Sequence, residues 1–372
     1  MNVLLCGGGT AGHINPAIAI AEEIKAENPS SKILFIGREG GFENELIKKA
    51  GFEYKTISIQ GLKRSLSIDN IKRIFIAMDA KRKARKIIEE FKPDIVLGTG
   101  GYVCWPVISA AKELKIPSAI HESNYVPGLT TKLLAKKCDT VFLNNQDTRK
   151  YFPERVRTVV SGTPLLLSFL SNNRNEARRK LGIKNDEIFI VSFGGSIGSE
   201  KMNETLVEII KKYSSKDKSI KHIHATGQKH FKIITDSYKP SEKTGCKIVP
   251  YIDNMPTVLH AADIVICRCG AITLSELQAV GVSAILIPSP NVAANHQLKN
   301  GKSLSDIDAA LLIEEKDLTF ESLKNAIDEL KNDENGRKKR AKTIKALSSV
   351  KASKIIVNEL FNVKNSRKKA VG

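Results

Sequence analysis

Long hydrophobic runs are absent from this sequence of 372 residues. No apolar stretch approaches the roughly 20 residues that a helix needs to span a bilayer. The chain opens directly on the strand-like NVLLC, without the basic and apolar segments of a secretory signal peptide. These absences argue against a membrane-spanning or secreted protein, and we expect one that is made and kept in the cytoplasm.

Cysteine and aromatic residues are also sparse. We interpret the cysteines as reduced and buried, because most lie in apolar, strand-like stretches: Cys6, Cys104, Cys138, Cys246, Cys267 and Cys269. No second Cys or His pair accompanies Cys267 and Cys269 at zinc-site spacing, so we expect no metal. Aromatic residues make up only 6% of the chain and no RNA-binding motif is visible, which weakens a nucleic-acid-binding interpretation.

Acidic residues are too few to balance the basic ones. The counts are 40 acidic and 59 basic residues, and the formal net charge is +19. Such an excess favours an anionic partner, which could be nucleic acid, an acidic membrane surface or a phosphorylated substrate. The charge alone does not choose among these three.

What the sequence does contain is a regular alternation of short β-rich runs and longer runs of helical period, such as 16–27. The β-rich runs are almost continuously apolar, as in parallel strands buried on both faces. We therefore expect two doubly wound α/β domains, with a break after a strand in VVSGTP at 159–164. The other predicted strands lie at 2–6, 32–37, 54–59, 94–98, 117–121, 140–143, 187–193, 220–225, 246–250, 263–267, 283–288 and 309–313.

Three glycine-rich turns each follow a predicted strand and precede a predicted helix: CGGGTAGHINP at 6–16, GTGGYV at 98–103 and FGGSIGSEKMNE at 193–204. Glycine lets backbone amides approach a ligand, and a helix N-terminus favours an anion. Because ligands of open α/β sheets bind beyond the carboxyl ends of the strands, we expect these turns to surround one cleft.

The first turn alone would also satisfy the GxGxxG spacing of a dinucleotide site, through Gly7, Gly9 and Gly12. Such a site needs an acidic residue at the end of the second strand to hold the ribose. Glu39 comes two residues late and adjoins Arg38, so the dinucleotide interpretation fits poorly.

Two further residues have both a structural and a functional interpretation. Glu276, in a fourth turn with the sequence CRCGAITLSEL, could accept hydrogen bonds from a ribose diol, or could simply be a solvated helix carboxylate. His13, at a helix start, could be a structural hydrogen-bonding residue or a general base, since neutral imidazole can accept a proton near pH 7.

Six segments, in this order, resemble the MurG family, the N-acetylglucosaminyltransferases of peptidoglycan lipid II synthesis: GGGTAGHINPAIAIAEEI, PDIVLGTGGYV, HESNYVPGLTTKLLAKKCD, GGSIGSEKMNE, YIDNMPTVLHAADIVICRCGAITLSE and NHQLKN. The resemblance runs from Asn2 to about Asn362. It implies an α/β protein of the GT-B fold, with two Rossmann-like doubly wound parallel-sheet domains facing an interdomain cleft.

The resemblance also implies how the chain divides. An acceptor and membrane-docking domain would span 1–162, and a UDP-GlcNAc-binding domain would span 163–345. A final helix at about 346–362 would pack back on the first domain, and 363–372 would form a basic tail.

The reaction implied is inverting transfer of GlcNAc from UDP-GlcNAc to the C4 hydroxyl of MurNAc in undecaprenyl-pyrophosphoryl-MurNAc-pentapeptide, lipid I, which gives lipid II. The implied partners are UDP-GlcNAc, lipid I and the anionic inner face of the plasma membrane, where the protein would bind peripherally on the cytoplasmic side. No nucleic acid, metal or cofactor is implied.

Family roles extend to the residues of this chain at matching positions. His13 would be the general base, Tyr102 would face the acceptor, and Asn124 and Gln297 would contact the GlcNAc. The resemblance places the other substrate contacts at the sugar (Thr10, Ala11, Gly12), the diphosphate (Ser196), the uracil through the backbone (Ile252), and the nucleotide and diphosphate (Ala271, Ile272, Thr273, Leu274, Ser275, and Glu276 on the ribose).

Some positions depart from the family pattern. Thr163 and Leu166 stand where the family has Asn and Arg, Ile197 replaces a Gln, and Cys269 replaces a Ser. The missing arginine would pair with the diphosphate, a contact worth roughly 1.5–3 kcal/mol. Residues that could compensate are Arg268 and Lys201.

These departures leave two alternatives open. One is a divergent UDP-GlcNAc-using enzyme with another acceptor or with epimerase activity. The other is a catalytically silent protein that binds nucleic acid or anionic lipid through its basic surface, with salt-sensitive affinity.

One basic segment suits a membrane surface. Between Lys63 and Lys92, ten basic and four acidic residues surround the apolar IFIAM at 74–78. Basic residues near an anionic bilayer contribute about 1 kcal/mol each. The alternative is a solvated helix face with a few core residues.

Overall fold

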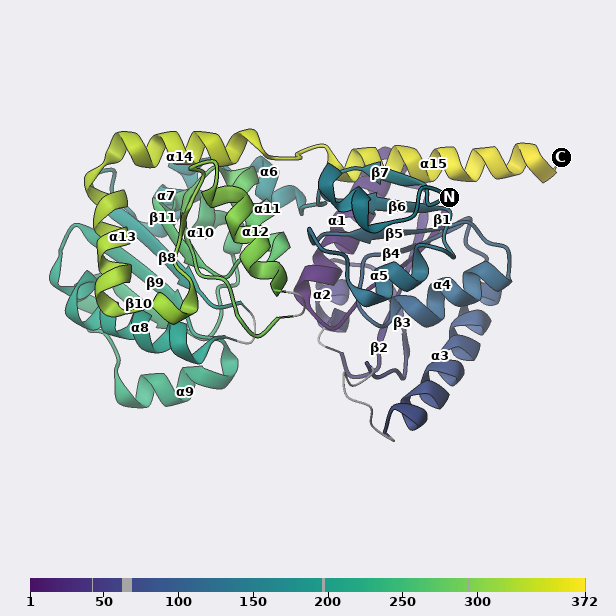
Figure 1. The fold of residues 1–372 in the computed structure, drawn as a ribbon, viewed down its shortest axis with the longest axis horizontal. Coiled ribbons are helices and arrows are strands. Elements are labelled where there is room, and N and C mark those ends of the chain that lie inside the picture. Colours follow the sequence, from purple (N-terminus) through teal and green to yellow (C-terminus); the bar gives the residue numbers. More distant parts are fainter. Residues whose placement is uncertain (42, 62–68, 196–197, 293–294, 372) are drawn as a thin grey trace. The chain divides into compact units, whose positions relative to one another are not determined.

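The computed structural model describes residues 1–41, 43–61, 69–195, 198–292 and 295–371. The chain forms two compact units. Unit 1 comprises Met1–Leu167 together with the segment that begins at Ser349, and unit 2 comprises Ser168–Ser348 (Figure 1). The chain passes from unit 1 to unit 2 after Leu167, five residues beyond the boundary expected at 162, and it returns to unit 1 at Ser349.

Unit 1 contains a fully parallel sheet of seven strands in the order β3-β2-β1-β4-β5-β6-β7. The strands are β1 (Asn2–Cys6), β2 (Lys32–Arg38), β3 (Glu53–Ile57), β4 (Ile95–Gly98), β5 (Ser118–Glu122), β6 (Thr140–Leu143) and β7 (Thr158–Val160). The strands predicted in this half are confirmed within two residues at their ends, because a strand buried on both faces leaves a continuous apolar run in the sequence.

Helices cover both faces of this sheet, and the side chains of β1 alternate between the two. Val3 and Leu5 join a cluster with α1 (Ala11–Glu27), α2 (Glu43–Lys49) and α15 (Ala352–Val371). On the opposite face, Leu4 and Cys6 pack with α3 (Asp69–Phe91), α4 (Cys104–Glu113) and α5 (Leu129–Leu134). A 3₁₀ turn, η1 (Gln146–Tyr151), lies between β6 and β7.

The first helix confirms the prediction that His13 lies at a helix start. The run of helical period at 16–27 belongs to this helix, which begins at Ala11 and contains Pro16. His13 therefore lies in the first turn of α1.

The C-terminal segment belongs to the N-terminal unit. The predicted final helix at about 346–362 corresponds to α15, which begins later, at Ala352, and follows the end of α14 (Glu334–Ala346). Ile356, Val357 and Leu360 of α15 are fully buried in the cluster that contains α1. Most of the predicted basic tail is helical, since α15 extends to Val371.

Unit 2 repeats the arrangement with a fully parallel sheet of six strands in the order β10-β9-β8-β11-β12-β13. The strands are β8 (Ile188–Phe193), β9 (Ile220–Ala225), β10 (Cys246–Val249), β11 (Ile264–Cys267), β12 (Ser283–Leu286) and β13 (Leu311–Leu312). The other elements are α6 (Leu167–Ser171), α7 (Arg174–Leu181), α8 (Glu200–Lys212), η2 (Ser214–Lys216), α9 (Gln228–Ser237), η3 (Glu242–Thr244), α10 (Met255–Ala261), α11 (Ala271–Val280), α12 (His296–Ser305), η5 (Glu315–Asp317), α13 (Phe320–Asn332) and α14.

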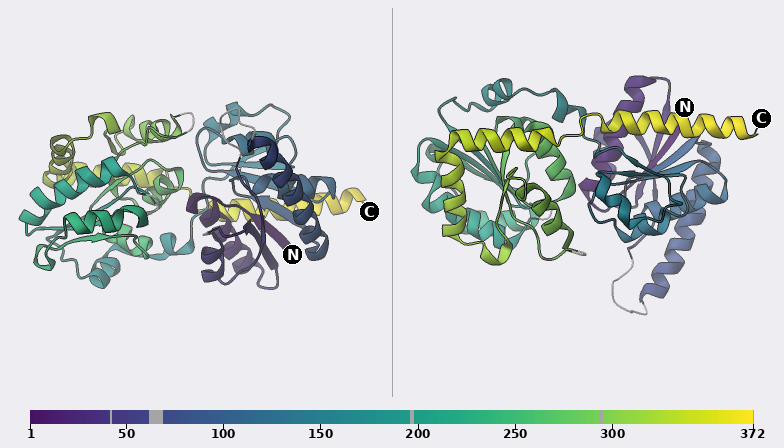
Figure 2. Two further views of the ribbon diagram at one scale, coloured as in Figure 1. Left: turned by 90° about the horizontal axis from the view of Figure 1, so that it is seen from below. Right: turned by 45° about the horizontal axis from the view of Figure 1, so that its top comes forward.

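In both sheets the chain winds outward from a central strand and then crosses to its other side (Figure 2). The order therefore reverses between β1 and β4 in unit 1 and between β8 and β11 in unit 2. Loops at the carboxyl ends of such paired strands are where open α/β sheets bind ligands. Among the helices of the described ranges, none has both the length and the apolar character needed to cross a bilayer.

Candidate functional site

At the reversal point of unit 1, the loops after β1 and β4 interlock through glycine backbone. A Cβ atom on Gly101 would lie 2.1 Å from the carbonyl oxygen of Gly8. One on Gly100 would lie 2.4 Å from Nδ1 of His13. Both Gly100 and Gly101 also have positive φ angles, of 116° and 82°. The first two glycine-rich turns therefore meet, and glycine is required for the close approach.

His13 lies in the first turn of α1, where its backbone N–H donates to the carbonyl of Thr10 at 3.0 Å. Its own carbonyl accepts a 2.6 Å hydrogen bond from the hydroxyl of Thr99. Desolvation lowers the pKa of the imidazole, and the carboxylate of Glu122 partly opposes this shift. The ring is therefore neutral at pH 7 and can accept a proton.

The remaining predicted residues of the first loop differ in exposure. Thr10 is the exposed N-cap of α1 and has an extended backbone, without a side-chain cap. Ala11 and Gly12 are the first two residues of the helix. They place their backbone at the open N-terminus of α1, where several N–H groups have no intrahelical partner.

Asn124 is held by a buried carboxylate at the end of β5. Oε1 of Glu122 accepts hydrogen bonds from the backbone N–H and the side-chain amide of Asn124, both at 2.9 Å. Oε2 of Glu122 accepts from the backbone N–H of Gly128 at 2.9 Å. This arrangement fixes the orientation of the Asn124 side chain next to the end of the sheet.

Sequence reasoning assigned no role to Glu122, Thr99 or His121. His121 is buried, and its Nε2–H donates to the carbonyl of Gly162 at 2.9 Å. Burial lowers the pKa of His121. The available signal was a set of polar residues directly after the apolar runs of β4 and β5, at the edge where ligands bind.

Tyr102 covers the first loop. A Cβ atom on Gly9 would lie 3.4 Å from its ring, and one on Gly61 would lie 3.2 Å from it. Gly61 is the last described residue before the segment 62–68. Tyr102 therefore packs over the loop that contains the base candidate.

In unit 2, the loops after β8 and β11 are joined by Arg268. Its guanidinium forms an ion pair with Glu315 and donates to the hydroxyl of Ser199. It also donates to the carbonyls of Ile287 and Pro288, both at 3.2 Å. Arg268 thus connects its own loop, after β11, to the segments that follow β8, β12 and β13, and its charge is already paired with a carboxylate.

The other residues named for diphosphate binding are less informative. Ser196 and Ile197 lie outside the described residues. Lys201 is exposed in the first turn of α8. Leu166 packs against the apolar cluster of unit 1 that contains α1 and α15, and Thr163 is buried.

Glu276 is the most unusual group in this unit. It lies in the second turn of α11, whose first turn contains Ala271, Ile272, Thr273 and Leu274, followed by Ser275. Within the described part of the chain, no hydrogen bond or ion pair involves its carboxyl group. Burial raises the pKa of Glu276 to about 8. A carboxyl group left without partners at this edge is suited to accept hydrogen bonds from a ligand.

Ile252 lies on the loop after β10, and Gln297 lies in the first turn of α12. The Ile252 side chain is buried, and the neighbouring Tyr251 is close enough to Glu276 for that carboxylate to help raise the tyrosine pKa. Oε1 of Gln297 accepts from the backbone N–H of Ser289 at 2.9 Å, which orients the amide. In the described ranges, no cluster of three or more His, Cys, Asp or Glu residues could hold a metal ion.

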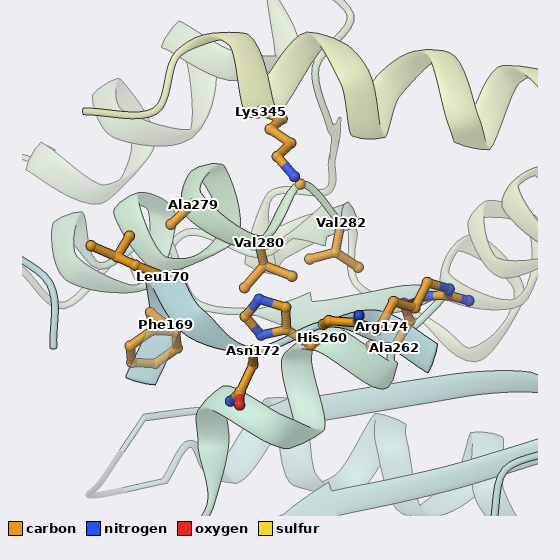
Figure 3. Close-up of a pocket in the computed structure, with 12 residues that line it drawn as sticks. Phe169, Leu170, Asn172, Arg174, His260, Ala262, Ala279, Val280, Val282 and Lys345 are labelled. Carbon is orange, nitrogen blue, oxygen red and sulfur yellow. Dashed lines mark hydrogen bonds between the residues drawn. The ribbon is translucent and has the colours of Figure 1, made fainter. Parts of the chain in front are cut away.

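A cavity of about 310 Å³ lies at the other edge of this sheet. It is lined by residues that precede β11 and β12, among them His260, Val280 and Val282, together with Lys345 of α14 (Figure 3). Because it lies at the amino ends of these strands, it is separate from the site described above.

Comparison with known proteins agrees with this division into two units. Residues 3–143 match the Glycosyltransferase family 28 N-terminal domain, and residues 189–356 match the Glycosyltransferase family 28 C-terminal domain. A protein of Acetivibrio thermocellus is 42% identical over 367 residues, which cover 99% of each chain. One of Clostridioides difficile is 41% identical over 373 residues, covering 100% of this chain and 91% of the other. Both are named UDP-N-acetylglucosamine–N-acetylmuramyl-(pentapeptide) pyrophosphoryl-undecaprenol N-acetylglucosamine transferase.

Solved structures have the same architecture. A crystal structure of Acinetobacter baumannii MurG has a TM-score of 0.74 at 26% identity, covering 97% of this chain and 99% of that one. The UDP-GlcNAc 2-epimerase of Neisseria meningitidis has a TM-score of 0.67 at 15% identity, covering 97% of this chain and 100% of that one. The epimerase likeness shows the fold alone, which is GT-B.

Proposed function

The chain belongs to the MurG group of glycosyltransferase family 28, and on that premise we propose that it moves GlcNAc from UDP-GlcNAc to the C4 hydroxyl of MurNAc in lipid I, giving lipid II. The observation that carries the proposal is the likeness, over 87–100% of this chain, to transferases named for this reaction, at 41–46% identity. The carboxyl group of Glu276, which has no hydrogen-bond or ion-pair partner among the described residues, supports it from the structure.

Unit 2 binds the donor in this proposal. Glu276 accepts hydrogen bonds from the two ribose hydroxyls, which supply the partners that the carboxylate lacks. The backbone of Ile252 holds the uracil, and Gln297, oriented by the backbone of Ser289, contacts GlcNAc hydroxyls. The N-terminus of α11, formed by Ala271 to Ser275, lies near the diphosphate in this proposal. Ser196, which precedes α8 in the sequence, also contacts the diphosphate.

Unit 1 activates the acceptor. His13 takes the proton of the C4 hydroxyl as that oxygen attacks the anomeric carbon of GlcNAc. The bond between this carbon and the diphosphate oxygen breaks, UDP leaves, and the configuration inverts. Thr99 and Gly100 hold His13 in place, while Asn124, fixed by Glu122, contacts the sugar together with Thr10, Ala11 and Gly12. Tyr102 packs over this loop on the acceptor side.

The charge that develops on the leaving UDP needs stabilisation in a site for which we propose no metal ion. The amino ends of α8 and α11 follow β8 and β11 at the reversal point and present backbone N–H groups. Fixed N–H donors of this kind stabilise developing negative charge without reorganisation. They take on a larger share here because Leu166 stands where the family has an arginine.

For the membrane, we propose that the protein docks peripherally on the anionic cytoplasmic face through α3. Four side chains of α3, Ile71, Ile74, Phe75 and Met78, are 51–71% exposed. We call them the α3 stripe. Their spacing places them on one face of the helix, whereas Ala80, Ala84 and Ile88 are buried in the core. Basic residues beside the stripe, such as Lys72 and Arg82, would lie at the lipid headgroups.

The deciding experiment is UDP release from UDP-GlcNAc by the purified protein, with and without a short-chain lipid I analogue. Release that requires the analogue, with a disaccharide product, is the expected result. Release or epimerisation without the analogue would favour the divergent enzyme that Thr163, Leu166 and Ile197 leave open. Absence of donor binding would favour a silent binding protein.

A further inference from the structure

Two buried histidines on one strand of unit 2 form a continuous hydrogen-bonded path with polar neighbours. His222 and His224 on β9 are 1% and 0% exposed. The hydroxyl of Ser192 on β8 lies 2.9 Å from Nε2 of His222 and 2.9 Å from Nδ1 of His224. Nε2 of His224 lies 3.1 Å from Oδ1 of Asn203. Strand positions in a central sheet are ordinarily apolar, so this polar path calls for an explanation.

The hydrogen bond between Asn203 and the Thr226 carbonyl determines which atom donates and which accepts along the rest of the path. The carbonyl of Thr226 can only accept, so the side-chain nitrogen of Asn203 donates to it at 3.0 Å. That leaves Oδ1 of Asn203 as the acceptor facing His224, whose Nε2 must therefore carry the proton. Nδ1 of His224 then accepts from the Ser192 hydroxyl, although the Ser192 carbonyl also lies 3.2 Å from it.

The path does not transfer charge. Burial lowers the pKa of His222 to about 3 and that of His224 to about 4, so both rings are neutral at physiological pH. Each ring is a fixed connector with one donor and one acceptor. The path therefore holds its side chains in fixed positions and carries no proton or charge.

The two ends of the path differ in what they reach. At one end, Nδ1 of His222 accepts from the hydroxyl of Ser214 in η2, at 3.0 Å. At the other end, Asn203 lies in the first turn of α8, where its backbone N–H donates to the carbonyl of Ser199 at 2.8 Å. Only the His224 end therefore reaches the loop that follows β8.

The backbone of Gly198, just before α8, closely approaches the same Thr226 carbonyl that Asn203 binds. A Cβ atom on Gly198 would lie 2.1 Å from the carbonyl oxygen of Thr226. Gly198 has a φ of 82° and is followed by Ser199, the N-cap of α8. Any shift of Asn203 or Thr226 is therefore transmitted directly to the backbone before α8.

We propose that His224 is a positioning residue that, through Asn203 and the Thr226 carbonyl, sets the backbone geometry of Gly198 and Ser199, at the start of α8, for the diphosphate of the nucleotide. The inference rests on the proposed function, which assigns the diphosphate to this end of α8. It predicts that loss of His224 weakens binding of the phosphates but leaves binding of the nucleoside unaffected.

The chain offers a matched control two residues away. His222→Phe removes a buried histidine that shares Ser192 with His224 but does not reach Asn203. His224→Phe keeps a ring in place without hydrogen bonds, and His224→Gln restores a donor toward Asn203. Both phenylalanine variants lower the melting temperature, so thermal stability alone does not distinguish them.

The measurements are calorimetric affinities for UDP and for uridine, and hydrogen exchange in the first turn of α8 without nucleotide. For His224→Phe we expect about tenfold weaker UDP binding, a change of less than twofold for uridine, and faster exchange. His222→Phe should leave all three close to the unaltered protein, and His224→Gln should recover most of the UDP affinity.

Equal losses of UDP affinity in the two phenylalanine variants would overturn the inference, as would equal losses of UDP and uridine affinity in His224→Phe. Unchanged exchange in α8 would also overturn it. If the unaltered protein bound no UDP, the donor assignment would fail together with the diphosphate half of this inference. Normal UDP binding with equal effects of both variants would overturn the inference alone.

Discussion

The hydroxyl of Thr99 donates a 2.6 Å hydrogen bond to the main-chain carbonyl of His13. The loop after β4 thereby holds the first turn of the helix that follows β1. The contact fixes the backbone of the proposed base, and Gly100 sets the position of its ring. Catalysis at His13 should therefore depend on Thr99, to which no substrate contact is assigned.

Replacing Thr99 with valine should lower stability by about 1 kcal/mol, because the His13 carbonyl loses the hydrogen bond from the Thr99 hydroxyl. Turnover should fall as the first turn of α1 relaxes, whereas Thr99→Ser should keep both. Thr140→Val is the matched control, since the buried Thr140 hydroxyl has no partner among the described residues. Urea unfolding and kcat of the variants check this, and equal effects of the two valine variants would refute it.

Replacement of His13 by alanine should reduce kcat by about 10²–10⁴, the range that a general base contributes. UDP affinity should be unchanged, because His13 is assigned to the acceptor side of the reaction. Steady-state kinetics and calorimetric UDP binding test both halves. Full turnover with normal donor binding would remove His13 from its assigned role.

Replacement of Glu276 by alanine should weaken UDP binding by about 10–100-fold through the lost ribose hydrogen bonds. The affinity for UDP should also depend on pH. The carboxyl group has a pKa of about 8 before binding, and ribose hydroxyls favour its ionised form, so binding at pH 7 should release a proton. UDP affinity should rise with pH up to about 8 and then level off. Calorimetry in buffers of different ionisation enthalpy measures this release, which Glu276→Gln should abolish.

The same carboxyl group should affect stability without any ligand. Its pKa is about 8 in the folded protein and 4.5 ordinarily, so the folded state binds more protons between these values. The free energy of unfolding should therefore fall as pH rises through that window. Glu276→Gln should remove the fall and stabilise the protein by about 1–2 kcal/mol above pH 8, after allowance for solvent screening. Parallel pH profiles of the two proteins would contradict this.

The glycine at position 101 should be far less replaceable than one at position 51. Both have positive φ, at 82° and 78°, but a Cβ on Gly51 meets nothing within 4 Å. Gly51→Ala should cost about 1 kcal/mol, the ordinary penalty for this backbone conformation. Gly101→Ala should cost at least about 2 kcal/mol more and reduce turnover, because its Cβ would overlap the Gly8 carbonyl. Chemical unfolding of both variants provides the measurement.

The α3 stripe should mediate binding to anionic vesicles. Phe75→Asp should weaken sedimentation with phosphatidylglycerol vesicles by about tenfold or more, through lost apolar burial and added negative charge. Ile233→Asp is the control, because Ile233 is 72% exposed on α9 and Phe75 is 71% exposed. Binding should also decrease with salt. Equal effects of the two substitutions would argue against α3 as the docking surface.

Some of these features could be predicted from the sequence and others could not. The strands were predictable because parallel, doubly covered strands are almost purely apolar. The turns after β1, β4, β8 and β11 were predictable because glycine marks close backbone approach. The helix start at His13 was predictable from the glycine-rich turn before it and the run of helical period after it.

The sequence could not show which side chains pair when they lie far apart in the chain. Nothing near Arg268 indicates that Glu315 neutralises it, and nothing in IKHIHA at 220–225 distinguishes the ring that reaches α8 from the one that reaches η2. Such partners are fixed only when the sheet brings distant segments together. Thr99 was missed for the same reason, whereas Glu122 binds Asn124 and Gly128, which lie close to it in the sequence.

The packing of α15 against α1 makes unit 2 an insertion within unit 1. The chain passes between the two units at both ends of Ser168–Ser348, so unit 2 is one continuous segment that can be excised. The complementary fragment Met1–Leu167 cannot, since it would expose to water the surface that Ile356, Val357 and Leu360 cover. C-terminal deletions that remove Ile356, Val357 and Leu360 would therefore damage unit 1, which contains His13, although unit 2 is closer to them in the sequence.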